Sequence, residues 1–89
     1  MIDLDKIREI YDEDMIISVK ENMSDVKKNI NFMVSLGFDD VVGLFESCTP
    51  VFIMDANEFK TKMTNLINKL GDDYVRLIEE DLNLLESIE

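Results

Sequence analysis

Hydrophobic residues recur along this chain at the three- and four-residue spacing of amphipathic helices, rather than with the alternation typical of strands. Ser24 and Asn57 each stand at a suitable capping position before such a stripe. The first stripe consists of Val26, Ile30, Met33 and Val34. The second consists of Phe59, Met63, Leu66, Ile67 and Leu70. With one proline and three glycines in 89 residues, the pattern predicts helices throughout and no sheet.

Two stretches repeat one order of features: LGFDDVVGLFE at 36–46 and LGDDYVRLIEE at 70–80. In each, a glycine ends the preceding helix, and two aspartates suit the positive start of the next one. The period of 33 to 34 residues is typical of stacked helical-pair repeats. The alternative is coincidence between two helical hairpins of a small bundle. The shared order of cap, stripe, glycine and acid pair favours the repeat.

The pattern therefore predicts a single all-α domain, a short right- or left-handed stack of antiparallel helical pairs. Residues 24–56 form the first repeat and 57–89 the second, while 1–23 form a degenerate cap unit, giving about two and a half repeats and six helices. The stripes of the cap unit are Ile2, Ile7, Ile10 and Tyr11, then Met15, Ile16, Val19 and Met23. In CTPVFIMD at 48–55, Pro50 ends a helix, and a 3₁₀ turn is expected to direct the next apolar residues into the core. The matching DLNLLESI at 81–88 lacks the proline and is expected to stay helical.

The stretch NFMVSLGFDDVVGLFESCTPVFIMDANEFKTKMTNLINKLG resembles the mitochondrial transcription termination factor (mTERF) family. Residues that match the repeat pattern of that family are Leu36, Gly37, Phe38, Val42, Leu44, Phe45, Pro50, Phe52 and Phe59. The resemblance covers residues 24–71 well and 72–88 moderately, and hardly extends to 1–23. It implies a curved helical solenoid that binds nucleic acid along a basic concave surface. The chain departs from that family in its small number of repeats and its negative charge.

The net charge of −11 disfavours a general affinity for nucleic acid or for an anionic membrane. The charges are divided between the helices of each pair. The second helices are predicted to present an acidic wall of Asp39, Asp40, Asp72, Asp73, Glu79 and Glu80. The first helices are predicted to present a lysine row of Lys27, Lys28, Lys60, Lys62 and Lys69. A solvated surface whose charges merely maintain solubility is the alternative for both sets.

Candidate chemistry is sparse. The chain has no histidine, no glycine-rich phosphate loop and one cysteine, so the sequence predicts neither an enzyme nor a cofactor or metal site. Cys48 is expected to be a buried small hydrophobe. No apolar run is long enough for a membrane span, and the first residues do not resemble a signal peptide, so we expect a cytoplasmic protein without a membrane partner.

Three functions remain open. The first is a non-catalytic acidic binding module for a protein partner, which would be basic if it contacts the acidic wall. The second is a small mTERF-like protein that binds nucleic acid through the lysine row. The third is an acidic nucleic-acid mimic that inhibits a nucleic-acid-binding enzyme. If neither charged set makes the contact, an apolar one is expected at Phe52 and Met54, after Pro50.

Overall fold

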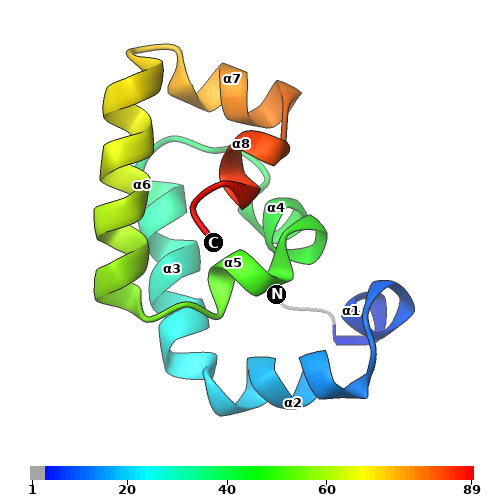
Figure 1. Cartoon of the computed structure of the whole chain (residues 1–89). Coiled ribbons are helices and arrows are strands. Elements are labelled where there is room, and N and C mark those ends of the chain that lie inside the picture. The colour runs from blue at the N-terminus through cyan, green and yellow to red at the C-terminus, as the bar shows by residue number, and fades with distance from the viewer. Residues whose placement is uncertain (1–3) are drawn as a thin grey trace.

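The computed structural model describes residues 4–89, which fold into α-helices without a strand (Figure 1). The predicted all-α class is therefore confirmed. The helices are α1 (Leu4–Ile10), α2 (Glu13–Glu21), α3 (Met23–Ser35), α4 (Val41–Ser47), α5 (Thr49–Phe52), α6 (Ala56–Leu70), α7 (Tyr74–Glu80) and α8 (Asn83–Glu86). Ile2 of the predicted cap stripe lies outside the described residues.

The predicted count of six helices is wrong, because the described residues contain eight. One additional helix is α5, a four-residue α-helical turn where a 3₁₀ turn was expected. The other is α8, which is separated from α7 although a continuous helix was expected. At the break, Asp81 has an extended backbone (φ −141°, ψ 94°), and its carboxylate accepts the N–H of Asn83 at 3.1 Å. This local side-chain bond competes with continuation of the helix.

The order long helix, seven-residue helix, four-residue helix occurs twice. Helices α3, α4 and α5 have 13, 7 and 4 residues, and α6, α7 and α8 have 15, 7 and 4. We call α3–α5 the first unit and α6–α8 the second unit. Figure 1 shows α3 and α6 side by side and running in the same direction, as equivalent helices of stacked units do.

The helix ends follow local backbone chemistry, and two of the predicted caps are wrong. Gly37 and Gly71 have positive φ of 101° and 80°, which ends α3 and α6 in the conformation that glycine adopts most readily. Asp55, rather than Asn57, caps α6, because its carboxylate accepts the N–H groups of residues 57 and 58, both at 3.1 Å. Ser24 lies inside α3, whose N-cap residue is Asn22.

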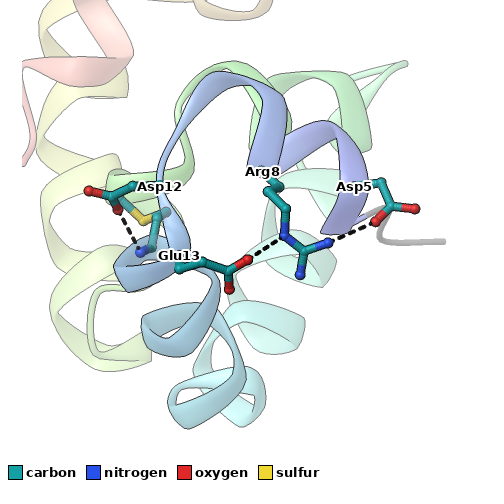
Figure 2. A network of polar contacts seen from close by, with 5 residues as sticks. Asp5, Arg8, Asp12 and Glu13 are labelled. Atoms are coloured by element: carbon teal, nitrogen blue, oxygen red, sulfur yellow. Dashed lines mark hydrogen bonds and ion pairs between the residues drawn. The ribbon is translucent and has the colours of Figure 1, made fainter.

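Helices α1 and α2 are linked by Arg8 at the surface, as Figure 2 shows. The Arg8 guanidinium donates to Glu13 Oε1 at 2.6 Å and to Asp5 Oδ1 at 3.1 Å. Asp12 caps α2 by accepting the N–H of Met15 at 3.2 Å. All of these groups are exposed, so each ion pair contributes little to stability, and the position of α1 and α2 depends on their buried apolar residues.

The core is built around three phenylalanines from consecutive helices. Phe45 of α4, Phe52 of α5 and Phe59 of α6 are fully buried, and the ring centroids lie 5.7 Å apart for the first two and 5.5 Å for the last two. Phe52 therefore joins the two units through the core, at the point where the chain passes from one to the next.

Two residues that the sequence assigned to apolar stripes are exposed instead: Ile10 at 60% and Val34 at 56%.

Asn29 is a polar residue in this core. It is 1% exposed on α3, and its amide donates to the carbonyls of Phe52 at 2.9 Å and Met54 at 2.8 Å. One helical turn earlier, Asp25 Oδ1 accepts the N–H of Ala56, the first residue of α6, at 3.2 Å. Two side chains of α3 thus satisfy backbone groups of the connection between α5 and α6, which would otherwise lose hydrogen bonds on burial.

Replacing Asn29 by alanine is expected to lower the free energy of unfolding by about 2–3 kcal/mol, because two carbonyls lose their donor. Asn31→Ala is the matched control, since Asn31 is exposed on the same helix and should change stability little. Urea denaturation followed by circular dichroism measures both. Equal stability of the two variants would contradict the structural role of Asn29.

Gly37→Val is expected to cost about 1–2 kcal/mol, because a β-branched residue is strained at positive φ. No atom lies within 4 Å of a Cβ placed on Gly37, so the cost comes from the backbone alone. Gly37→Asn should therefore cost clearly less, since asparagine tolerates positive φ better. Thermal denaturation of the two variants checks this order, and an equal loss would show that contacts decide instead.

Candidate partner-binding site

A surface hollow of about 290 Å³ lies between α4 and α7, and we call it the α4–α7 groove. Its lining consists of Asp40, Gly43, Leu44, Ser47, Glu79 and Leu82. Asp40 and Glu79 belong to the predicted acidic wall, and the structure brings them to one hollow although they are 39 positions apart in the sequence. Leu44 and Leu82 add apolar surface between the acids.

Gly43 determines how Asp40 lies in this groove. Asp40 is the N-cap of α4, and its Oδ1 accepts the Gly43 N–H at 3.0 Å. A Cβ on Gly43 would overlap the Asp40 carboxylate. Glycine within a helix costs about 0.5–1 kcal/mol relative to alanine. In return, the carboxylate lies across the first turn of α4 and on the lining of the groove.

The other acids of the predicted wall lie outside the groove. Arg76 on α7 pairs with Asp73 at 2.9 Å and with Glu80 at 3.3 Å, so these two carboxylates are already balanced by a cation. Asp39 and Asp72 are exposed in the turns before α4 and α7. The structure therefore divides the wall into an Arg76 cluster, two turn aspartates and the pair in the groove.

The lysines do not form the single row that was predicted. Lys60 lies with its ammonium 5.9 Å from the ring centroid of Phe32, and so leans from α6 toward α3. Lys62 pairs with Glu58 at 3.0 Å and, with Lys69, lines a different hollow beside residues 87–89. Lysines two positions apart point to different sides of a helix, which separates Lys60 from Lys62. Lys27 and Lys28 are exposed on α3.

Phe52 is fully buried, so the prediction that it forms an accessible apolar contact is wrong. The turn after Pro50 directs Phe52 between Phe45 and Phe59 instead. Met54 is partly buried and packs against the core, while its carbonyl is held by Asn29. Together these positions make the turn a link between the units.

Cys48 is 1% exposed, and burial raises the pKa of its thiol from 9.0 to about 11, with a further contribution from the negative charges of Glu86 and Glu89. The reactive form of cysteine is the thiolate, so this environment opposes nucleophilic chemistry. Within residues 4–89, no group of three or more acids, cysteines or histidines is arranged to hold a metal ion. None of the helices described is both long and apolar enough to span a membrane.

The reasoning from sequence missed the residues that shape the groove: Gly43, Leu44, Ser47 and Leu82. One signal was available, since Gly43 stands three residues after Asp40 and inside a predicted helix, where glycine is unfavourable. The apolar lining gave no signal, because leucines at helical spacing predict a core face equally well.

Comparisons of the chain with protein-family models, with curated proteins and with solved structures gave no match. The resemblance to the mTERF family therefore stays a prediction from the leucine, glycine and proline pattern of residues 24–88.

The raised pKa of Cys48 predicts how stability depends on pH. Above pH 9.0 the thiol of the unfolded chain loses its proton, whereas the folded chain keeps it until about pH 11. The unfolded state then binds fewer protons, so the free energy of unfolding should fall as the pH rises through this window. Denaturation at pH 8 and pH 10 should show a smaller fall in Cys48→Ala. An equal fall in both proteins would contradict the assignment.

Proposed function

We propose that the protein is a non-catalytic binding module that holds a basic segment of a partner protein in the α4–α7 groove. The single observation that carries the proposal is the convergence of Asp40 and Glu79 on one hollow beside Leu44 and Leu82. An arginine or lysine side chain matches this combination, because its aliphatic stem packs on apolar surface while its charged head meets carboxylates.

The charge distribution supports a basic partner. Helices α3 and α6 hold five lysines against Asp25 and Glu58, a net charge of +3, which leaves −14 for the rest of the chain. The second unit after α6 holds seven acids against Arg76. A negative field of this kind attracts a basic protein during encounter, and salt should slow the association. A nucleic-acid-binding enzyme is one class of partner with the required positive surface.

The net positive charge of α3 and α6 favours a second candidate function, binding of nucleic acid by these two helices. Lys27, Lys28 and Lys60 are exposed on them, together with amide and hydroxyl side chains such as Asn31 and Thr64. Such groups contact phosphate and sugar without reading sequence. We rank this function below protein binding, because the −14 elsewhere repels a phosphate backbone.

The test compares two charge-neutralised proteins after partners are captured from a lysate and identified by mass spectrometry. Asp40→Asn with Glu79→Gln removes both carboxylates from the groove, while asparagine still caps α4. Asp39→Asn with Glu80→Gln makes the same change in charge outside the groove. We expect the first protein to bind its partner about tenfold more weakly or worse, and the control to change the Kd less than about threefold.

Gly43→Ala separates binding from stability in the same assay. The methyl group displaces the Asp40 carboxylate, so binding should weaken, while the gain in helix propensity offsets much of the lost cap. Equal affinities of all variants for the captured partner would refute the proposal. Binding of duplex DNA at low salt that is lost on Lys27→Glu with Lys60→Glu would establish the second function instead.

A further inference from the structure

A second surface hollow, of about 240 Å³, lies beside α6 on a different part of the molecule from the α4–α7 groove. We call it the α6–α8 hollow, because it lies between α6 and the residues at the end of α8. Its lining consists of Lys62, Asn65, Leu66, Lys69, Ser87, Ile88 and Glu89. The proposed function makes no use of these residues.

The repeat identifies the equivalent surface of the first unit. Lys62, Asn65 and Leu66 stand 33 positions after Asn29, Phe32 and Met33 of α3, the same offset that separates the starts of α3 and α6. Ser87 and Ile88 stand 34 positions after Ile53 and Met54, the offset that separates the starts of α5 and α8. The α6–α8 hollow of the second unit therefore corresponds to the surface formed by α3 and residues 53–54 in the first.

In the first unit, a helix covers that surface. The helix is α6, whose Phe59 ring lies 6.2 Å from the ring of Phe32 and 5.5 Å from that of Phe52, measured between centroids. The Lys60 ammonium of α6 lies over the Phe32 ring, 5.9 Å from its centroid, and Met33 is fully buried. In Figure 1, α6 lies beside α3 and extends past its C-terminal end. The fold thus contains its own example of a helix packed on this kind of surface.

We infer that the α6–α8 hollow is a docking site for an amphipathic helix of a partner protein that carries acidic residues beside its apolar stripe. The apolar part of the contact is formed by Leu66 and Ile88, which line the hollow and are 8% and 7% exposed. A helix that repeats the placement of α6 on the first unit covers both. This is helix-in-groove recognition, for which apolar anchors recur at every third or fourth position.

Differences between the two units specify the charge of the occupant. Lys62 and Asn65 replace Asn29 and Phe32, so the second surface is more polar than the first. Lys62 and Lys69 lie seven positions apart on α6, about two turns, and therefore face one side. Lys69 forms no ion pair with another described residue, whereas Lys62 pairs with Glu58 at 3.0 Å. The lining contains both lysines and Glu89, and since Glu58 already balances Lys62, Lys69 is the cation that remains for an acidic side chain of the occupant.

A second copy of this chain is a poor occupant of the α6–α8 hollow, because of its net charge. Two copies carry −11 each, and like net charges of that size oppose their approach. A partner whose acidic residues are confined to one helix can contact Lys62 and Lys69 with that helix. The rest of its surface can be neutral or basic, so its net charge does not oppose the approach.

The experiment titrates the ¹⁵N-labelled 89-residue chain with a synthetic helical peptide, followed by NMR. The peptide has leucines at positions i, i+4 and i+7 with glutamates flanking them, and a matched peptide has glutamine at each glutamate. We expect chemical-shift changes at Leu66, Lys69 and Ile88, with the glutamine peptide binding several-fold more weakly. Lys62→Glu with Lys69→Glu should weaken the glutamate peptide by about tenfold or more, since two favourable charges become repulsive.

Lys27→Glu with Lys28→Glu is the control, because it changes the net charge equally on α3 and should leave the peptide Kd within about twofold. Ile88→Asp should remove binding of both peptides, and its unchanged circular dichroism spectrum would show that the fold persists. The inference is overturned if the glutamate peptide does not bind or if both lysine pairs affect it equally. It is also overturned if the shifts fall at Leu44 and Glu79, or if the chain self-associates through Lys62 and Lys69.

Discussion

The hydrogen bonds that Asn29 donates to the carbonyls of Phe52 and Met54 fix the passage from the first unit to the second. At this point the chain leaves α5, turns through three residues and begins α6, and helix ends of this kind leave backbone groups without a partner inside the helix. Asn29 and Asp25 are four positions apart and lie on one face of α3, from which they satisfy both sides of the turn. Their spacing sets where α6 begins along α3, and Phe59 then meets Phe32 and Phe52.

Both proposed binding surfaces follow from that placement. Because α6 is fixed on α3, α7 passes beside α4, and the Tyr74 hydroxyl of α7 donates to the Leu36 carbonyl at 2.8 Å. The α4–α7 groove is the result of this passage. In the second unit, Lys62 occupies the position equivalent to Asn29, and its ammonium pairs with Glu58. Among the described residues, Lys62 forms no hydrogen bond with residues 87–89, which follow α8. Where the first unit has a buried asparagine that donates to two backbone carbonyls, the second unit thus has a lysine that lines an open hollow.

The sequence predicted features that depend on residues close together in the chain, such as helix ends. It did not predict features that depend on contacts between residues far apart in the chain. Gly37 and Gly71 were placed correctly, because a glycine after an apolar stripe has few roles other than ending a helix. The break at Asp81 was missed, since an aspartate in a helical pattern is usually a solvated side chain. Asn29 was missed because it interrupts no stripe, and only the fold reveals two carbonyls within its reach. The acidic wall was predicted as a set, yet its division depends on Arg76 and on the angle at which α7 passes α4.

The opposite charges of the two surfaces have a structural cause in the repeat itself. First helices pack beside each other, so each needs long side chains that cover apolar neighbours and still reach water, as Lys60 does over Phe32. Second helices begin after an aspartate pair, which places carboxylates at their N-termini, where the helix dipole favours them. Two such units therefore carry most of their lysines on the first helices and an aspartate pair before each second helix, whether or not a partner binds there. Gly43 beside Asp40 is the clearest departure from this scheme, because glycine lowers helix stability there while it leaves room for the Asp40 carboxylate on the lining of the α4–α7 groove.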